Sequence, residues 1–334
     1  MGDIDSKLYG NGFLGAMKPT LGPLKRRFLY PPFSVLNTRD GFWQDRKRRW
    51  IALGIKSEVG RPDRGMDRTN RKRKPPRGIS GRNSGGGYSI NADKYSGGGT
   101  EIGRGTSIFD PVLTELAYTW WCPPGGIVVD PFAGGSVRGI IASILGLKYW
   151  GCELRSEQVE ANKHQRKEII KGKYKPRWVC GDSADKLLEA PQADFLLSCP
   201  PYGNLEQYSD DPRDISGMPY EDFLLRYRQI ISIACDRLSD DRFACFVVAN
   251  YRDKQIGGGM RNLVGDTVLA FEDCGLLLYN EAILVNAVGS AAMRANTNFV
   301  RGAKKLVKTH QNVLVFVKGD PKKAAERIDN QKES

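Results

Sequence analysis

Residues 194–202 read Asp-Phe-Leu-Leu-Ser-Cys-Pro-Pro-Tyr, a short apolar run that ends in two prolines and an aromatic residue. An apolar run of this length predicts a buried β-strand. Pro200 and Pro201 have a fixed φ and no backbone N–H, so they predict a rigid strand end whose carbonyl groups can face a flat ligand. Tyr202 adds a ring that can stack on such a ligand and a hydroxyl that can bind it. The tetrad that begins at Cys199 is therefore the first candidate catalytic site.

A second strand followed by a turn is predicted upstream, where residues 128–135 read Val-Val-Asp-Pro-Phe-Ala-Gly-Gly. The two glycines let the backbone approach a ligand closely, and the start of the next helix offers free N–H groups. Glu153 ends the following predicted strand, about 20 residues on, where a carboxylate can bind a ribose diol. Asp182 ends the strand after that, where it can accept a hydrogen bond from an adenine amine. Taken singly, each acid is better explained as a helix cap or a solvated loop residue.

The phosphate-binding pattern G-x-G-x-x-G is incomplete, because Ser136 and Val137 interrupt it. A nucleoside without phosphates fits this turn better than a dinucleotide does.

From about residue 105 onward, predicted strands alternate with predicted helices, which is typical of an α/β fold with a mostly parallel sheet covered on both faces. The expected strands are 127–129, 149–152, 178–180, 195–198, 243–249, 276–286 and 312–318. The expected helices are 110–121, 139–145, 156–170, 220–237 and 260–274.

The positive charge of the chain is concentrated at one end. Residues 1–105 contain 22 Lys or Arg and 9 Asp or Glu, whereas residues 106–334 contain 29 of each kind, so the net charge of +13 lies entirely in the first third. Such a basic extension is typical of a segment that contacts nucleic-acid phosphates, with a solubilising tail as the alternative. Residues 61–87, rich in Arg, Lys, Gly, Ser and Pro, are expected to be disordered or ordered only by a partner.

Several classes of protein are excluded by composition. Seven cysteines without C-x-x-C spacing indicate neither a disulfide framework nor a zinc site, and two histidines are too few for a histidine-based metal centre, so no metal is expected. No apolar stretch is long enough to span a membrane, and no signal pattern begins the chain. We therefore expect a cytoplasmic protein without a membrane partner; the sequence leaves its oligomeric state open.

The order of these motifs resembles a known family. A strand followed by Asp-Pro-Phe-Ala-Gly-Gly, an acid after the second strand, Gly-Asp after the third and x-Pro-Pro-Tyr after the fourth resemble the S-adenosylmethionine-dependent DNA methyltransferases. More narrowly, the chain is similar to the phage- and prophage-type DNA methylases of the amino-methyltransferase lineage, over about residues 105–319. The resemblance implies a class I methyltransferase fold, which is Rossmann-like with a seven-stranded, mostly parallel sheet. It also implies S-adenosylmethionine as the cofactor, DNA as the partner, and the cytoplasm of a phage-infected or bacterial cell as the location.

The resemblance also implies roles for individual residues. The turn after the first strand would hold the methionine part of the cofactor, the acid after the second strand its ribose, and the acid after the third its adenine side. Residues 106–110 match the remaining cofactor motif less specifically. The cofactor-binding residues so implied are Asp130, Phe132, Ala133, Gly134, Glu153 and Asp182, and the catalytic residues are Cys199, Pro200, Pro201 and Tyr202.

The tetrad departs from the family at its first position, where relatives carry Asp, Asn or Ser. Cys199 is a poor acceptor for a hydrogen bond from an exocyclic amine. A thiolate, however, is the nucleophile that methylation of cytosine at carbon 5 requires. We therefore favour carbon 5 of cytosine as the target and keep the exocyclic amines, adenine N6 and cytosine N4, as the alternative. In either case Tyr202 is expected to stack on a base flipped out of the duplex.

Carbon-5 chemistry also requires a proton donor and a base, for which Glu206, Asn250 and Arg252 are secondary candidates. The neighbouring acids at 210, 211 and 214 are expected to have structural roles. Trp43 and Trp50 could stack on DNA or form a small packed core.

Only 16 residues separate Asp182 from Cys199, so no target-recognition domain fits between the two halves of the site. The DNA-reading part is expected in the basic N-terminal third or in the loops 203–219 and 286–311. The second loop carries a candidate phosphate-contact stripe, with an ordinary solvated charge run as the alternative: Arg294, Arg301, Lys304, Lys305 and Lys308.

The expected domain organisation is a basic, partly disordered extension over 1–105, a methyltransferase domain over 106–319 and a charged tail over 320–334. RNA base methylation and a non-catalytic nucleic-acid-binding role stay open as alternatives.

Overall fold

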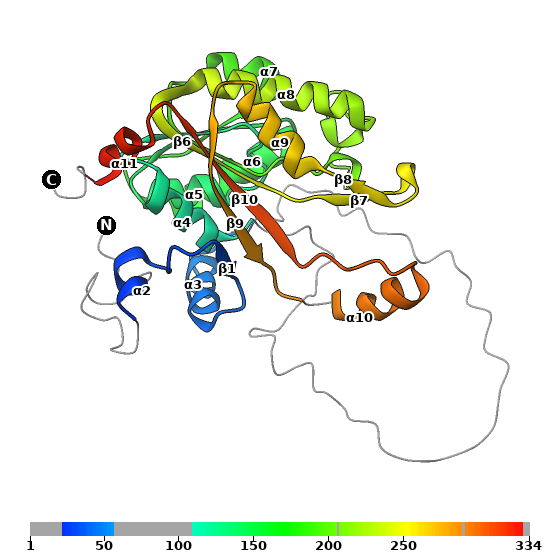
Figure 1. Cartoon of the computed structure of the whole chain (residues 1–334). Coiled ribbons are helices and arrows are strands. Elements are labelled where there is room, and N and C mark those ends of the chain that lie inside the picture. Colours follow the sequence, from blue (N-terminus) through cyan, green and yellow to red (C-terminus); the bar gives the residue numbers. More distant parts are fainter. Residues whose placement is uncertain (1–21, 57–108, 206, 289–290, 330–334) are drawn as a thin grey trace. The chain divides into compact units, whose positions relative to one another are not determined.

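A computed structural model of the protein describes residues 22–56, 109–205, 207–288 and 291–329. The expected α/β class is confirmed: within these residues helices cover both faces of one large, mostly parallel sheet (Figure 1). The strands of this sheet are β1 (Val35–Asn37), β2 (Ile127–Asp130), β3 (Lys148–Glu153), β4 (Arg177–Cys180), β5 (Ala193–Ser198), β6 (Leu238–Val248), β9 (Leu277–Val285) and β10 (His310–Lys318). The helices are α2 (Pro23–Phe28), α3 (Gly41–Ile51), α4 (Pro111–Trp121), α5 (Val137–Ile144), α6 (Ser156–Ile169), α7 (Ser183–Lys186), α8 (Tyr220–Arg237), α9 (Leu263–Glu272), α10 (Ala291–Asn296) and α11 (Pro321–Asp329).

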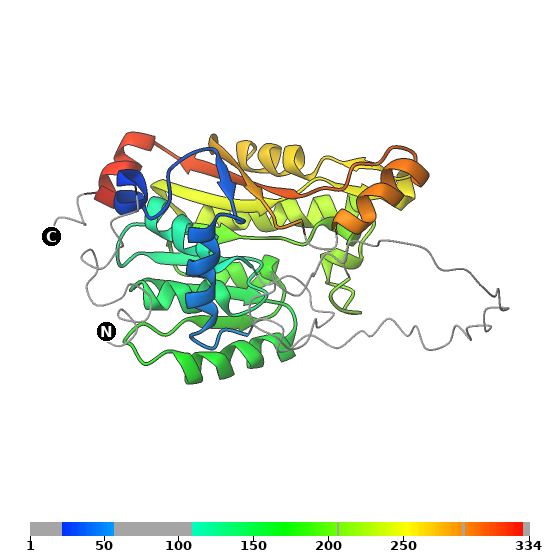
Figure 2. The ribbon, with the colours of Figure 1, turned by 90° about the horizontal axis from the view of Figure 1, so that it is seen from below.

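The sheet has the order β1-β9-β10-β6-β5-β2-β3-β4. Strands β2 to β6 are parallel to one another, whereas β10 is antiparallel to both of its neighbours, β6 and β9. All seven expected strands are present, and β1 adds an eighth that the sequence did not predict. It pairs in parallel with β9, beside which it lies in Figure 2.

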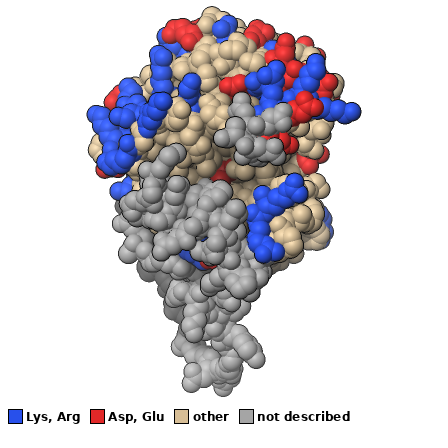
Figure 3. All heavy atoms as spheres, turned by 90° about the vertical axis from the view of Figure 1, so that its left-hand side faces the viewer, with Lys and Arg blue, Asp and Glu red and all other residues tan. Residues whose placement is uncertain are grey.

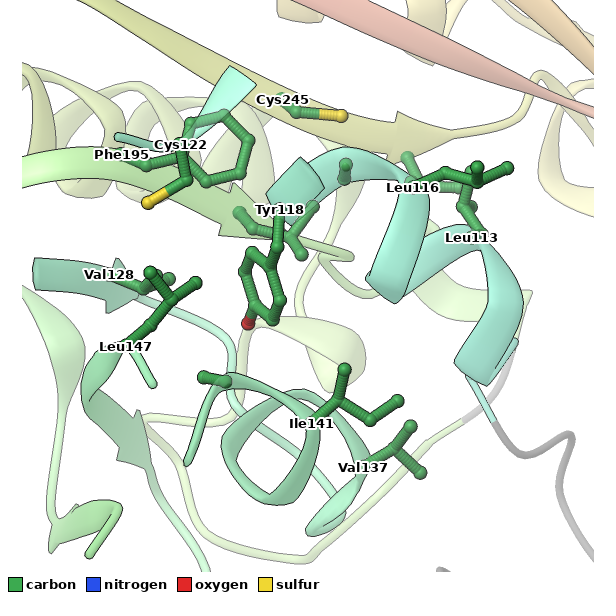
Figure 4. Packing of buried hydrophobic residues seen from close by; sticks show 14 of the residues in the cluster. Leu113, Leu116, Tyr118, Cys122, Val128, Val137, Ile141, Leu147, Phe195 and Cys245 are labelled. Atoms are coloured by element: carbon green, nitrogen blue, oxygen red, sulfur yellow. The ribbon is translucent and has the colours of Figure 1, made fainter. Parts of the chain in front are cut away.

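The central strands β2 and β5 are buried on both faces, and their residues alternate between two cores. Val128 and Phe195 face a core shared with α4 and α5, whereas Val129 and Leu196 face a second core shared with α8 and α9. Figure 4 shows the first core, with Tyr118 of α4 between the strands and α5. This alternation is the period-2 pattern of β-strands with helices on both sides.

Helix α4 begins as the sequence predicts. Asp110 is its N-cap and accepts hydrogen bonds from the backbone N–H groups of Val112 (2.9 Å) and Leu113 (3.2 Å), and Pro111 occupies the first helical position.

The N-terminal part that the structure describes packs on α4. Trp43 and Trp50 are 0% exposed; the indole N–H of Trp50 donates to Glu115 at 2.8 Å, and Arg46 forms a buried ion pair with Glu115. The idea that these tryptophans stack on DNA is therefore wrong, and the packed alternative is confirmed. Residues 22–56 belong to the same compact unit as residues 109–329. The expected boundary near residue 105 and most of the basic N-terminal segment lie outside the described residues.

Replacing Trp50 by phenylalanine is expected to lower the free energy of unfolding by about 1–3 kcal/mol, because it leaves the buried Glu115 without one of its donors. Urea denaturation measures this change. Phe33→Leu, at a side chain that is 62% exposed, is the control and should change the stability by less than about 0.5 kcal/mol. An unchanged free energy of unfolding in the Trp50 variant would contradict a stabilising role for this hydrogen bond.

Two C-terminal segments differ from the expectation. The predicted helix 260–274 begins at Leu263, because residues 259–261 form β8 (Gly259–Arg261), which pairs with β7 (Tyr251–Asp253) in an antiparallel hairpin. The expected charged tail contains α11, whose Ala324 and Ile328 are buried in the first core. An apolar stripe among charged residues was the signal that we missed there. Among the described residues, none of the helices is both long and apolar enough to cross a membrane.

Candidate active site at the ends of β2 and β5

The two sequence motifs meet at one edge of the sheet. Strands β2 and β5 are parallel neighbours, with Val128 opposite Phe195 and Val129 opposite Leu196. The chain runs from β2 outward to β3 and β4 and then returns to β5 on the other side of β2, so the strand order reverses between β2 and β5. In open α/β sheets, ligands bind at the carboxyl ends of the strands at such a reversal. The 131–135 turn follows β2 there, and the tetrad follows β5.

Ser198 joins the two strand ends. Its hydroxyl donates to Asp130 Oδ1 at 2.7 Å and accepts the backbone N–H of Phe132 at 3.1 Å. Ser198 and Asp130 are both 0% exposed, so these bonds form away from competing water. The sequence analysis passed over Ser198; its signal was a hydroxyl in the last position of an otherwise apolar strand.

Asp130 is the centre of a buried polar network. Arg138 Nε donates to Asp130 Oδ2 at 2.6 Å, and Tyr149 Oη donates to the same oxygen at 2.7 Å. Arg138 Nη2 also donates to the carbonyls of Phe132 (2.6 Å) and Ala133 (3.0 Å). Asp130 therefore positions the turn through its neighbours.

The charges of this network support one another. Burial alone would lower the pKa of Arg138, but the adjacent Asp130 carboxylate raises it above its ordinary value, so the guanidinium keeps its charge. Burial, reinforced by Asp130, raises the pKa of Tyr149 well above its ordinary value, and the phenol keeps its proton. Arg138 was missed at the sequence level because an arginine in the first turn of α5 gives no sign of being buried.

Glu153 contacts the glycine turn directly. Its Oε2 accepts the backbone N–H of Gly134 at 3.0 Å, and its Oε1 accepts that of Arg155 at 3.1 Å. Gly134 has φ +52°, a conformation that favours glycine, and no atom lies within 4 Å of the place a Cβ would occupy. The turn therefore has open space beside it. The structure brings Gly134 and Glu153 together as the sequence predicted.

The other predicted cofactor residues lie around this turn. Ala133 is buried and its N–H donates to the carbonyl of Cys152 at 2.9 Å, while the half-buried Phe132 packs against Tyr227 with ring centroids 5.9 Å apart. Both therefore hold the turn in place. Of residues 106–110, only Phe109 and Asp110 are described. The guanidinium carbon of Arg138 lies over the Phe109 ring, 4.5 Å from the centroid of that ring.

Asp182 follows β4 at the same edge, two strands from β2. Its Oδ1 caps α7 by accepting the N–H of Ala184 at 2.9 Å, and its Oδ2 pairs with Arg226 at 2.6 Å. The helix-cap reading of this acid is thus confirmed. Any contact of Asp182 with adenine would have to use the remaining lone pairs of these two oxygens.

In the tetrad, Pro200 is buried and the other three residues are half-buried. Tyr202 Oη accepts from Gln311 Nε2 at 2.7 Å and lies 3.6 Å from Cys199 Sγ and 3.5 Å from the carbonyl oxygen of Val247. Because Gln311 donates to the phenol oxygen, the phenol proton is left for Cys199 or Val247. Burial, with a further contribution from Cys199, raises the pKa of Tyr202 well above its ordinary value, so the hydroxyl stays protonated.

Gln311 lies in β10, 109 residues from Tyr202 in the sequence, and a single glutamine in a strand carries no local signal. The loop after the tetrad is anchored nearby. Gly203 has φ +52°, and a Cβ there would lie 1.9 Å from Tyr251 Oη, so only glycine fits against β7.

The secondary candidates have structural contacts. Asn250 Oδ1 accepts the N–H of Val264 at 2.8 Å at the start of α9, and Arg252 donates to the carbonyl of Gly258 within the β7–β8 hairpin at 3.1 Å. Glu206 lies outside the described residues. The acids after the tetrad are structural as expected: Asp211 pairs with Arg213, and Asp214 caps a 3-10 turn at Ser216.

Cys199 differs from the packed cysteines of the protein. Burial raises the pKa of the Cys122 and Cys245 thiols, and it raises that of Cys152 to about 12, so these thiols stay protonated and unreactive. Cys199 is half-buried at a strand end. Within the described part of the chain, no group of three or more His, Cys, Asp or Glu side chains could hold a metal ion.

No protein-family model and no curated protein matches the sequence. Among solved structures, the protein is similar to TrmN from Thermus thermophilus (TM-score 0.41, 14% identity, 63% of this chain and 49% of that chain). It is also similar to the magnesium protoporphyrin IX methyltransferase ChlM from Synechocystis PCC 6803 with bound SAH (TM-score 0.42, 12% identity, 65% and 90%). A TehB-like SAM-dependent methyltransferase from Corynebacterium glutamicum matches at TM-score 0.38 and 19% identity (64% and 90%). The chain thus spans about half the length of TrmN. These are distant likenesses of the α/β fold, and the chemistry of this chain has to come from its own residues.

Proposed function

We propose that this protein transfers a methyl group from S-adenosylmethionine to a base in DNA, with carbon 5 of cytosine as the favoured target. The observation that carries the proposal is the joining of β2 and β5 by Ser198 at the point where the strand order reverses. A glycine turn suited to a nucleoside lies on one side of this junction, and a half-buried thiol beside a phenol lies on the other. Two reactants held side by side react far faster than two that meet in solution.

On the cofactor side, the residues present fit a nucleoside that carries no phosphate. The open space at Gly134 admits a ligand close to the backbone, and the adjacent Glu153 carboxylate can accept hydrogen bonds from ribose hydroxyls. Asp182, which follows the end of β4, would approach the adenine. When bound, S-adenosylmethionine supplies an electrophilic methyl group. Ser198 and Arg138 keep the turn at a constant place relative to the tetrad.

On the base side, Cys199 would act as the nucleophile. Its thiolate would form a bond to carbon 6 of cytosine, which makes carbon 5 nucleophilic toward the methyl group; loss of the carbon-5 proton and of the sulfur then restores the aromatic ring. The Tyr202 hydroxyl, 3.6 Å from the sulfur and protonated, can donate to the thiolate and so favour it.

Exocyclic-amine transfer is the second candidate, and a specific observation favours it. Asn250 and Arg252, which carbon-5 chemistry could have used for proton transfer, are engaged in the α9 cap and the β7–β8 hairpin. Amine transfer needs only acceptors for the amine protons, and the carbonyls at the rigid Pro200–Pro201 end can supply them.

Mass spectrometry of nucleosides from the DNA of an expressing host tests the proposal, because it identifies the modified base directly. Cytosine methylated at carbon 5 is expected; methylated adenine or cytosine N4 would establish the amine chemistry instead. In vitro, tritium from labelled cofactor should enter duplex DNA in preference to structured RNA. Tritium incorporation into RNA alone would show that RNA, and not DNA, is the substrate. No incorporation into either nucleic acid, together with no cofactor binding, would refute the proposal.

Glu153→Gln is expected to weaken S-adenosylmethionine binding by about 10- to 100-fold, because hydrogen bonds to a charged group are worth about 1.5–3 kcal/mol. Isothermal titration calorimetry gives the dissociation constant. Glu157→Gln, at a half-exposed side chain four residues away, is the matched control and should bind the cofactor normally. Equal affinity of the Glu153 variant and the wild type would remove Glu153 from the cofactor site.

A further inference from the structure

A basic arm, defined as residues 291–308, connects β9 to β10. It consists of α10, a π-helical turn over Thr297–Arg301 and an extended return. Residues 286–309 contain five Lys or Arg and no Asp or Glu, so the segment carries a charge of +5. A charge density of this sign and size favours a polyanionic partner.

The arm is fastened to the sheet edge that carries the tetrad. Lys308 Nζ donates to the carbonyl of Asn250 at 3.2 Å, just beyond the end of β6. Three residues further on, Gln311 donates to Tyr202 Oη at 2.7 Å. A Cβ on Gly258 would lie 2.8 Å from Lys305 Nζ, so Lys305 lies against the turn of the β7–β8 hairpin. Figure 1 shows α10 and this hairpin on the same side of the sheet, beyond the end of β6.

The tip of the arm exposes apolar side chains between cations. Phe299 is 44%, Val300 64% and Leu306 73% exposed, although burying such side chains would be favourable. Arg301 and Lys304 are exposed beside them, and Lys304 Nζ lies 4.9 Å from the Phe299 ring centroid.

The tip also has a strained backbone. Ala303 and Lys304 have φ angles of +58° and +60°, a left-handed conformation that non-glycine residues rarely adopt. The turn is held by hydrogen bonds from the N–H of Lys304 to the carbonyl of Phe299 and from that of Lys305 to the carbonyl of Asn298, both 3.1 Å long. Strain of this kind persists only where the surrounding structure holds it, and it clusters at functional segments.

We propose that the basic arm inserts into duplex DNA: Arg294, Arg301 and Lys304 bind phosphates, and Phe299 with Val300 enters the base stack beside the target nucleotide. This inference rests on the proposed function for the identity of the nucleic acid. A base that is to be modified must leave the stack, which costs unstacking and unpairing free energy. Apolar side chains flanked by cations are the means by which proteins part stacked bases. The arm supplies both the apolar side chains and the cations. The hydrogen bond from Gln311 to Tyr202 holds the C-terminal end of the arm next to the tetrad.

Binding of the full-length protein to a fluorescent duplex, with and without one abasic site, tests this proposal. An abasic gap removes the unstacking cost, so the wild type should bind it about tenfold or more tightly than the intact duplex. Phe299→Ala should reduce this ratio toward one while leaving the salt dependence unchanged. R301Q/K304Q should do the reverse: the ratio persists, and the slope of log K against log salt becomes shallower by about 1.8, at about 0.9 for each lost phosphate contact.

Matched controls are available elsewhere in the chain. Phe33→Ala changes an exposed phenylalanine outside the arm, and K322Q/K323Q removes two charges from α11. On the described surface visible in Figure 3, Lys and Arg form several separate groups, of which the one at the upper right is mixed with Asp and Glu. Both controls should bind like the wild type.

An abasic preference and a salt slope that are unchanged in both arm variants would overturn the proposal, as would binding of the arm to anionic phosphatidylserine vesicles but not to DNA. Failure of the methyl-transfer proposal would show itself separately, as absent cofactor binding in calorimetry with arm-dependent DNA binding intact.

Discussion

Replacing Cys199 by serine is expected to abolish methyl transfer to cytosine carbon 5, with kcat lowered by more than about 10³-fold. The serine hydroxyl ionises far less readily than a thiol, so it cannot add to carbon 6 at neutral pH. Tritium transfer from labelled S-adenosylmethionine to DNA measures the loss. Cofactor affinity should be unchanged, because Cys199 follows β5, whereas the glycine turn that we propose as the cofactor site follows β2.

The same variant distinguishes the two chemistries. Transfer to an exocyclic amine should survive or improve in Cys199→Ser, because a hydroxyl oxygen accepts a hydrogen bond better than sulfur does. Cys180→Ser is the control and should retain full activity, because Cys180 is an exposed cysteine at the end of β4. Full activity of Cys199→Ser together with a carbon-5 product would exclude Cys199 as the nucleophile.

Replacing Arg138 by methionine is expected to lower the free energy of unfolding by about 3–5 kcal/mol, the usual effect of removing one partner of a buried ion pair. Asp130 is 0% exposed and would be left with an uncompensated charge, and the carbonyls of Phe132 and Ala133 would lose their donor. Urea denaturation measures the loss. S-adenosylmethionine binding should weaken as well, because those two carbonyls belong to the glycine turn that we propose as the cofactor site.

Two companion variants make this result interpretable. Arg228→Met breaks an ion pair with Asp273 whose side chains are 39% and 65% exposed, and it should change the stability by about 1 kcal/mol or less. The double variant Arg138→Met/Asp130→Asn removes the stranded charge and should recover part of the loss. If Arg138→Met alone were as stable as the wild type, Asp130 would have to reach water or another cation.

The sequence predicted the elements whose signals are local. The apolar runs predicted all seven strands of the expected sheet, and Asp110 with Pro111 predicted the start of α4. One element that it missed depends on a distant partner: β1 is three residues long, and its Val35 pairs with Ile283 of β9, more than 240 residues away. So short a strand has no periodicity to detect, and it is stable only through its neighbour.

The site divides in the same way. The sequence by itself determined that a glycine turn, two acids and the tetrad each stand at the end of a strand. It could do so because strand ends and turn residues are recognised from local patterns. Only the tertiary structure decided what these side chains contact: Asp130 faces Arg138 and Ser198, and Tyr202 faces Gln311. The physical reason is that a side chain's partners are set by which strands become neighbours in the sheet, and that depends on the burial of the whole chain rather than on any one segment.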